Sequence, residues 1–378
     1  MTRISAPWLL DDASQRVCRL LTDAGHQAWF VGGCVRNALL GEPVADLDLA
    51  TDATPQTVID LAKAAGIHAI PTGIDHGTVT VVANDTPFEV TTFRRDVATD
   101  GRRARVAFSD NITDDARRRD FTMNALYAAP DGAVADPLGG LPDLLAHRVR
   151  FIEDAERRIK EDYLRILRFF RFYAWYGDAG AGPDADGLAA CAANIEGLQS
   201  LSVERVTAEM LKLLAAPDPA PALAAMASTG ALAQVLPGAD SGRLAVLVHL
   251  ERSLDVPPDP LRRFAVIGGA PAEVLRLSKA QLRALASITS GLSPAEASYR
   301  YGESVGRDVL LIQSASLGQP VDRAMLEPIA AAALQVFPLK AADLMPALRG
   351  PELGDALKEA EARWIKSGFT LTKAQLLD

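Results

Sequence analysis

The feature that most constrains the fold of this chain is a change of pattern near residue 150. Before it, short apolar or β-branched runs alternate with amphipathic stretches that glycine and proline separate. From Glu153 onward nearly every stretch has the alanine and leucine periodicity of helices, and prolines divide it. We therefore expect an α+β head, with a mixed or antiparallel sheet and helices, followed by an all-α neck, body and tail.

The length of 378 residues exceeds one ordinary core and indicates several domains. We expect a catalytic head over residues 1–147, a helical neck over 148–235 and a helical body and tail over 236–378. The head should contain both helices and strands. Helices are expected over 11–25, 34–40 and 54–66, and strands over 27–31, 46–50, 77–83 and 88–93. Residues 95–113 are polar and arginine-rich and are expected to form a mobile loop, whereas 153–177 should be one long helix that ends at Gly177.

Composition excludes several classes of protein. A chain with 49% hydrophobic and 23% charged residues is globular. It has no apolar run long enough to span a membrane, and its first residues lack a secretory signal. The three cysteines lie far apart, which predicts neither a disulfide framework nor a zinc site and favours the cytoplasm. The net charge of −9 does not by itself indicate a nucleic-acid partner.

Two acids stand in an otherwise apolar strand pattern, at Asp46 and Asp48. Side chains alternate along a strand, so both carboxylates should share one face while Leu47 and Leu49 point into the core. Carboxylates held side by side are a ligand set for a hard divalent cation, of which Mg²⁺ fits best because it also takes phosphate oxygens. Glu89, on a later strand, offers a third carboxylate. The alternative is a set of solvent-facing acids.

A glycine pair precedes these acids. Gly32 and Gly33 should end a strand and begin a helix, where bare N–H groups can approach a phosphate. Arg36 lies one helical turn further and can reach the same anion. Taken with Asp46 and Asp48, this pattern indicates a triphosphate and magnesium site, although a glycine pair alone is more often only a tight turn.

The order of motifs resembles one family. The segments VGGCVRNALLG and DLDLATDATP are similar to the head of class II tRNA nucleotidyltransferases and bacterial poly(A) polymerases, within the polymerase-β-like nucleotidyltransferases. The resemblance continues through PTGIDHGTVTVV, EVTTFRRD, RRRDFTMNALY, DPLGGLPDL, EDYLRILRFFRF and VERVTAEMLKLL, and it covers roughly residues 25 to 235. Asn37 departs from the pattern, since the family usually has Asp after the arginine.

The resemblance implies a role for each matching residue. It places magnesium on Asp46 and Asp48, and the triphosphate on Gly33 and Arg36. It also implies that nucleotide contacts come from a second set of residues: Arg119, Asp120, Asn124, Arg168 and Arg171. Asp120 and Asn124 would lie near the ribose, where an amide beside a carboxylate can serve a 2′-OH as donor and acceptor.

The motif EDYLR bears on the choice of base. Asp162 and Arg165 are three residues apart, so we expect them to be neighbours on one helix face. A carboxylate accepts from the exocyclic amine of cytosine or adenine, and an arginine donates to the ring nitrogen. Uracil and guanine present a carbonyl there, so the pair would select C and A without a template. The alternative is an ordinary ion pair within the helix.

The function implied is a CCA-adding enzyme. It would extend the 3′ end of tRNA from CTP and ATP by two-metal nucleotidyl transfer and release pyrophosphate, with Mg²⁺ as cofactor. The loop over residues 95–113 would then switch the pocket from C to A. Rival interpretations are a poly(A) polymerase, an enzyme that adds only CC or only A, and a non-catalytic RNA-binding protein. The five histidines include no His-Asp pair, so no phosphohydrolase activity is expected. No protein partner can be inferred.

Overall fold

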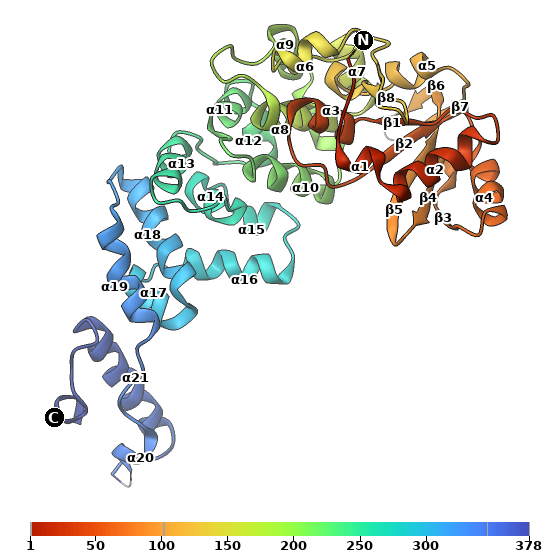
Figure 1. The fold of residues 1–378 in the computed structure, drawn as a ribbon. Coiled ribbons are helices and arrows are strands. Elements are labelled where there is room, and N and C mark those ends of the chain that lie inside the picture. Colours follow the sequence, from red (N-terminus) through yellow and green to blue (C-terminus); the bar gives the residue numbers. More distant parts are fainter. Residues whose placement is uncertain (1, 101–102, 346, 378) are drawn as a thin grey trace. The chain divides into compact units, whose positions relative to one another are not determined.

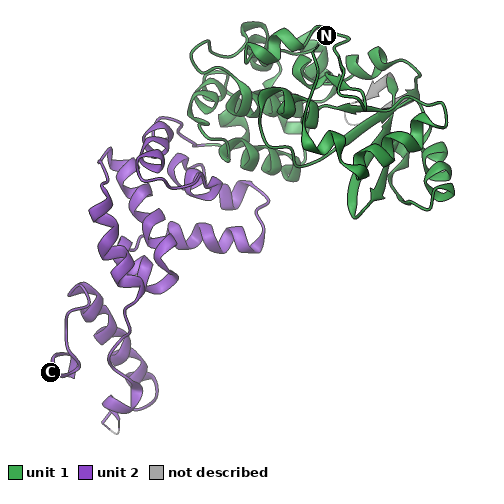
Figure 2. Cartoon of the chain, in the orientation of Figure 1, with its two compact units in different colours: residues 1–237 green, residues 238–378 purple. Residues whose placement is uncertain are grey.

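The computed structural model describes residues 2–100, 103–345 and 347–377, and the side chains of 96–106 lie outside that description. By contacts within the chain it divides into two compact units, Met1–Pro237 and Gly238–Asp378 (Figure 2). The first unit contains both the head and the helices that follow it. The predicted division of this unit at residue 147 remains a prediction.

The head is built on a mixed seven-stranded sheet with the order β3-β4-β5-β2-β1-β8-β9 (Figure 1). Strand β2 pairs in parallel with β5, and the other neighbours pair antiparallel. The strands are β1 Trp29–Val31, β2 Asp48–Thr51, β3 His68–Gly73, β4 Thr78–Ala83, β5 Thr86–Thr92, β8 Tyr127–Ala128 and β9 Val134–Ala135. The predicted α+β class is confirmed.

Helices of the head pack around this sheet where their apolar faces meet it. Helix α4 begins as predicted, since the Thr54 hydroxyl accepts from the Thr57 N–H and Pro55 occupies the first position. Helices α2 and α4 pack against the edge formed by β3, β4 and β5, and α3 packs against β1. The helices are α1 Pro7–Leu10, α2 Asp12–Thr22, α3 Gly33–Leu40, α4 Pro55–Ala64, α5 Ile112–Arg117 and α6 Leu141–Leu145, with 3₁₀ turns η1 Ile74–His76 and η2 Thr122–Asn124.

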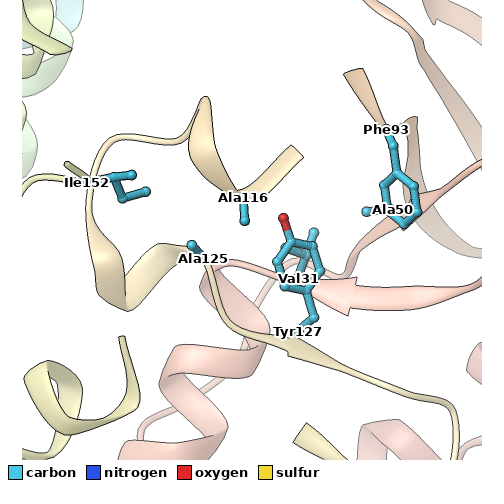
Figure 3. Packing of buried hydrophobic residues seen from close by; sticks show 7 residues of the cluster. All are labelled: Val31, Ala50, Phe93, Ala116, Ala125, Tyr127 and Ile152. Atoms are coloured by element: carbon cyan, nitrogen blue, oxygen red, sulfur yellow. The ribbon is translucent and has the colours of Figure 1, made fainter. Parts of the chain in front are cut away.

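A small core joins the centre of the sheet to the segments that follow the hairpin. Figure 3 shows Tyr127 of β8 packed with Val31 of β1 and with Ala116 of α5, all fully buried. The same cluster contains Ala50, Phe93, Ala125 and Ile152. Since Val31 directly precedes the Gly32-Gly33 turn and Ala116 precedes Arg119, this packing fixes the backbone on which the polar side chains stand.

The remaining helices of the first unit attach to the head through aromatic rings. Phe121 contacts Phe151 at 4.9 Å and Phe172 at 5.0 Å between ring centroids, and Phe151 stacks on Phe169. Helix α8 therefore shares a core with the head, and α10 and α11 pack on it. These elements are α7 Ala155–Glu161, α8 Leu164–Tyr176, α9 Ala185–Ala193, η3 Ile195–Ser200, α10 Val203–Leu214, α11 Ala220–Ser228 and α12 Ala231–Val235.

The second unit is helical throughout its described residues, as predicted. Its buried polar centre is Glu251, which accepts from both Arg262 and Arg263. A second cluster gathers around Trp364, which packs edge-to-face on Tyr299. The elements are α13 Leu244–Ser253, α14 Pro260–Ile267, α15 Pro271–Val274, α16 Lys279–Ile288, α17 Pro294–Tyr301, α18 Glu303–Leu317, η4 Arg323–Leu326, α19 Glu327–Ala333, α20 Ala341–Leu344, α21 Gly350–Lys366 and α22 Lys373–Leu377. No helix in the described part of the chain is both long and apolar enough to cross a bilayer.

Two predictions about single elements are wrong. Much of the expected loop over residues 95–113 is an antiparallel pair, β6 Arg94–Asp100 and β7 Arg103–Phe108, while residues 101–102 lie outside the described part. The expected helix over 153–177 is interrupted, because Asp162 adopts an extended backbone between α7 and α8. Its side chain accepts from the Leu164 N–H, and such local bonding competes with helix continuation.

Candidate active site

The glycine turn between β1 and α3 forms one wall of the site. Gly32 has φ +72°, a backbone conformation that residues other than glycine rarely adopt. A Cβ added there would lie 3.4 Å from Nη1 of Arg119. Gly33 begins α3, and its predicted place between strand and helix agrees with the structure. The Gly32 N–H donates to the carbonyl oxygen of Leu126 at 3.3 Å, so the N–H groups that the start of α3 offers to an anion beside this arginine begin at Gly33.

The acids lie on the neighbouring strands. Asp48 begins β2 and pairs in register with Glu89 of β5, whereas Asp46 precedes the strand and is exposed. Burial, together with the charges of Glu89 and Asp46, raises the pKa of Asp48 to about 6, although Arg119 acts in the opposite direction. A cation that approaches Asp48 would therefore stabilise the charged form of its carboxylate.

These carboxylates fit a divalent ion with few protein ligands. In the described residues, no three His, Cys, Asp or Glu side chains come together as ligands of a metal. Asp46 and Asp48 would therefore share such an ion with oxygen atoms of a bound substrate. Magnesium commonly binds in this way, through one or two carboxylates and phosphate oxygens.

A chain of hydrogen bonds connects Arg36 to helix α8. Nη1 of Arg36 donates to Oδ1 of Asn124 at 2.5 Å, and Nδ2 of Asn124 donates to Oδ1 of Asp120 at 2.8 Å. Nε of Arg168 donates to the other oxygen of Asp120 at 2.7 Å. Arg171, one turn further along α8, pairs with the buried Glu209 at 2.5 Å. The structure thus brings together five residues that the sequence placed near the nucleotide.

Asp120 is held as an anion in this chain. Burial alone would raise its pKa, but the charge of Arg168 and the hydrogen bonds from Asn124 and Arg168 place the pKa below its usual range. A buried carboxylate with these partners stays ionised at neutral pH. Its Oδ1 accepts from the Phe121 N–H and from Asn124, and its Oδ2 accepts twice from Arg168, so a ligand hydroxyl would replace one of these donors.

A cavity of about 300 Å³ opens beside this chain. Its lining combines two acids with five arginines and one leucine: Asp120, Asp162, Arg118, Arg119, Arg165, Arg168, Arg205 and Leu164. Asp162 and Arg165 thus both line one cavity. A polar cavity rich in arginines suits a compact anionic ligand.

The alternative of an ion pair within the helix between Asp162 and Arg165 is not what the structure contains. Asp162 lies between two helices, and its Oδ2 accepts from Arg205 of α10 at 2.6 Å. Arg165 donates to Glu161 at 2.7 Å and to the carbonyl oxygen of Arg118 at 2.9 Å. The prediction that the two residues are neighbours on one helix face assumed a continuous helix, but Asp162 lies in the break before α8.

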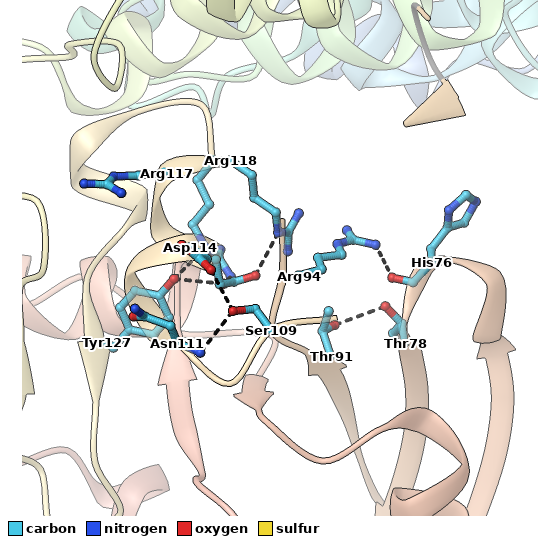
Figure 4. A network of polar contacts seen from close by, with 12 residues as sticks. His76, Thr78, Thr91, Arg94, Ser109, Asn111, Asp114, Arg117, Arg118 and Tyr127 are labelled. Atoms are coloured by element: carbon cyan, nitrogen blue, oxygen red, sulfur yellow. Dashed lines mark hydrogen bonds and ion pairs between the residues drawn. The ribbon is translucent and has the colours of Figure 1, made fainter. Parts of the chain in front are cut away.

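Sequence reasoning missed the buried acid that positions Arg119. Asp115 of α5 accepts from Arg118 at 2.8 Å, from Arg119 at 2.9 Å and from the Tyr127 hydroxyl at 2.8 Å. Figure 4 shows Arg118 and Tyr127 converging on this point near the base of the β6–β7 pair. The spacing of DDARRRD allows an acid to meet arginines three and four residues later, so this signal was present in the sequence.

Comparison with known proteins agrees with this geometry. Residues 28–150 match the model of the poly A polymerase head domain, and residues 183–242 match the model described as the probable RNA and SrmB-binding site of polymerase A. Together the two matches contain the glycine turn, the carboxylates, the Arg36 chain as far as Asp120, and Arg205. The fold and the site define a nucleotidyltransferase head of the polymerase-β-like type.

The names of the matching relatives point to a narrower group of nucleotidyltransferases. Human mitochondrial CCA tRNA nucleotidyltransferase 1 is 41% identical over 207 residues, which is 54% of this chain and 48% of the relative. The CCA-adding enzyme of Geobacillus thermodenitrificans is 42% identical over 224 residues, covering 59% and 54%. The chain thus spans about half the length of the curated relatives it matches. The structure of the Bacillus stearothermophilus CCA-adding enzyme in complex with CTP superposes with a TM-score of 0.76 and 28% identity, over 96% of this chain and 94% of that one. By these matches the chain is similar to poly A polymerases and to CCA-adding enzymes in its head and in the helices that follow.

Proposed function

We propose that this protein adds CCA to the 3′ end of tRNA from CTP and ATP, without a template, and releases pyrophosphate. One observation carries the proposal: the cavity that contains Asp162 and Arg165 adjoins the chain from Arg36 to Arg168. Base-reading and phosphate-binding groups are thereby within one unit. The names of the relatives, among them CCA-adding enzymes bound to CTP and to ATP, support the same reaction.

The residues of this chain divide the work by their chemistry. The backbone N–H of Gly33 binds the triphosphate together with Arg36 and Arg119, and Gly32 provides the turn that leaves room for Arg119. Asp120 and Asn124 accept from and donate to the ribose hydroxyl. Arg168 and Arg171 hold the surrounding acids, and they keep the potential positive where the pyrophosphate leaves.

Base selection is assigned to Asp162 and Arg165. One oxygen of Asp162 accepts from the Leu164 N–H and the other from Arg205, which fixes the carboxylate in the cavity. A carboxylate oxygen has capacity for a second donor, which the exocyclic amine of cytosine or adenine supplies. A carbonyl of uracil or guanine in the same place would face an acceptor and be rejected.

Asp46 and Asp48 would hold magnesium, with Glu89 as a further carboxylate beside them. When bound, magnesium activates the attacking 3′-hydroxyl and neutralises charge on the leaving phosphates. The protein itself aligns the two substrates by the contacts above. Cytoplasmic location is part of the proposal, since the described cysteines are all free and buried.

The test uses purified protein, Mg²⁺ and tRNA transcripts that end at the discriminator base, after C or after CC. Each transcript is incubated with each nucleoside triphosphate separately. The proposal predicts C addition to the first two transcripts and A addition only to the third. An enzyme that adds only CC or only A would extend only part of this set.

Two rivals give different outcomes in the same assay. A poly(A) polymerase would extend an oligoadenylate primer with ATP and ignore tRNA that lacks CCA. A non-catalytic RNA-binding protein would bind tRNA and extend none of the primers. Either result would refute CCA addition.

A further inference from the structure

The guanidinium of Arg36 is a buried cation whose partners are all neutral. Arg36 is 7% exposed, and its hydrogen bonds run to Oδ1 of Asn124, to Oδ1 of Asn37 and to the hydroxyl of Tyr176. The ring of Tyr176 covers its face, with a centroid distance of 4.1 Å. Four of the five guanidinium N–H groups donate in these bonds. The donors therefore have partners, but no carboxylate in contact compensates the positive charge.

The charges around Arg36 do not supply that compensation. The nearest acid that acts on it, Asp120, is committed to Arg168 through its Oδ2. Arg171 is a like charge in the same environment, and burial lowers the pKa of Arg36. Burying an unpaired cation costs free energy unless an anion joins it. An incoming triphosphate is such an anion.

Among the residues that contact Arg36, Asn37 occupies the place where a carboxylate could supply the counter-charge. Its Oδ1 lies 3.2 Å from Nε and 3.0 Å from Nη2 of Arg36, the positions that one carboxylate oxygen would take in an ion pair. Its Nδ2 donates to the carbonyl oxygen of Pro43 at 2.8 Å, in the segment that leads from α3 toward Asp46. The amide accepts from the arginine and donates to the carbonyl at once, whereas an ionised carboxylate in its place could only accept. This is also the position where the sequence departs from the family pattern.

We propose that Asn37 leaves the charge of Arg36 uncompensated in the free protein, so that the triphosphate of the substrate provides the counter-charge. Asn37 is thus a positioning residue that acts through Arg36 and sets affinity for polyphosphate without reference to the base. The inference rests on the proposed function, because it concerns the same nucleotide site. It predicts that protein stability and triphosphate affinity change in opposite directions when residue 37 gains a charge.

The decisive variant is Asn37→Asp, which has the same shape and adds one negative charge. Asn37→Ser is its partner, because it also removes the amide that bonds to Pro43 but adds no charge. Gln319→Glu, at an exposed position of the second unit, controls for the change in net charge. For each protein, calorimetry measures Kd for inorganic tripolyphosphate, CTP and UTP, and thermal unfolding without ligand gives Tm.

Asn37→Asp should raise Kd for tripolyphosphate and for CTP about tenfold, leave the ratio of CTP to UTP affinity unchanged, and raise Tm. Asn37→Ser should keep Kd within about twofold of wild type, the range of a lost neutral contact, and should not raise Tm. Gln319→Glu should match wild type in both measurements. The affinity loss in Asn37→Asp should also shrink in high salt.

Three results would overturn the inference: equal Kd for Asn37→Asp and wild type, equal weakening by the Asp and Ser variants, or a lower Tm or failure to fold in Asn37→Asp. If wild-type protein binds CTP but Asn37→Asp binds it equally well, only this inference fails. If wild-type protein binds neither CTP nor tripolyphosphate in the presence of Mg²⁺, the proposed function fails as well.

Discussion

At the scale of single residues, the acids of the site are in two opposite electrostatic situations. Asp48 faces Glu89 and Asp46, and its pKa is raised to about 6. Asp115 and Asp120 are more deeply buried, yet arginines and hydrogen bonds hold their pKa values below the usual range. Asp48 is in the first situation, in which a bound cation would stabilise the charged carboxylate. The other two acids already have cations and serve to orient them.

Replacement of Asp48 should separate activity from stability. Asp48→Asn is expected to abolish nucleotide addition, because it removes a ligand of the divalent ion. Without divalent ions, at neutral pH, it should stabilise the protein by roughly 2 kcal/mol, since the raised pKa means that the charge disfavours the fold. Urea unfolding in EDTA and a tRNA extension assay measure the two effects. Near-normal turnover would refute the metal assignment.

Asp115 predicts a pH dependence of the opposite sign. Burial alone would raise its pKa, but Arg119 and Arg118 together with the Tyr127 hydroxyl lower it to about 2. A lowered pKa contributes stability that is present above pH 4 and is lost as the pH falls toward 2. Asp115→Asn should therefore cost roughly 2 kcal/mol at pH 7, and less at pH 3. Denaturant unfolding at both values measures the difference, and a cost that does not shrink at pH 3 would contradict this account.

Asp162→Asn tests the choice of base while keeping the oxygen that accepts from the Leu164 N–H. The amide NH₂ donates where the carboxylate accepted, so it favours a carbonyl over an exocyclic amine. We expect the preference for CTP and ATP over UTP and GTP to fall at least about tenfold. Arg205→Lys serves as a control, because it retains the cation beside an intact carboxylate. Unchanged preference with only a lower Tm would show that Asp162 is structural.

At the scale of elements, the sequence correctly predicted the helices whose hydrophobic periodicity agrees with the capping, proline and glycine signals at their ends. Helix α4 begins at Pro55 after its Thr54 cap, and helix α8 ends before Gly177. Strand β3 was missed because it is a mostly exposed strand at the edge of the sheet and contains Pro71. The break at Asp162 was missed because periodicity continues across it, while the competing bond is made by the side chain itself.

The candidate site was predictable in its residues but not in its pairings. Glycines, acids and arginines at motif spacing identified Gly32, Asp48 and Arg36. Partners far along the chain left no local signal, such as Tyr176 for Arg36, 140 residues away, and Arg205 for Asp162, 43 residues away. Those contacts depend on how α8 and α10 pack, which spacing alone does not determine.

The β6–β7 pair gives a prediction for an element. It connects β5 to the helix that carries Asp115, and Arg94 at its base donates to the carbonyl oxygen of His76 (Figure 4). Removing residues 98–107, most of whose side chains lie outside the described part, should leave CC addition largely intact and cripple addition of A. The physical reason is that re-aiming the cavity between C and A needs an attached element that moves. Rates on transcripts ending before C, after C and after CC measure this, and equal losses on all three would contradict it.

At the scale of the whole molecule, every residue assigned to the nucleotide lies in the first unit, residues 1–237. The second unit has its own buried centre around Glu251 and contributes none of them. Domains with separate cores commonly divide catalysis from substrate binding. We propose that the helices of residues 238–378 contact the tRNA of the proposed reaction.

The most direct test of the central claim is the sequence of the product. A tRNA transcript that lacks CCA is incubated with the 378-residue chain, Mg²⁺ and all four nucleoside triphosphates together, and the 3′ ends are sequenced. The account predicts that nearly all extended molecules end in CCA and stop there, although UTP and GTP are present. Tails of A alone, tails that contain U or G, or no extension at all would contradict it.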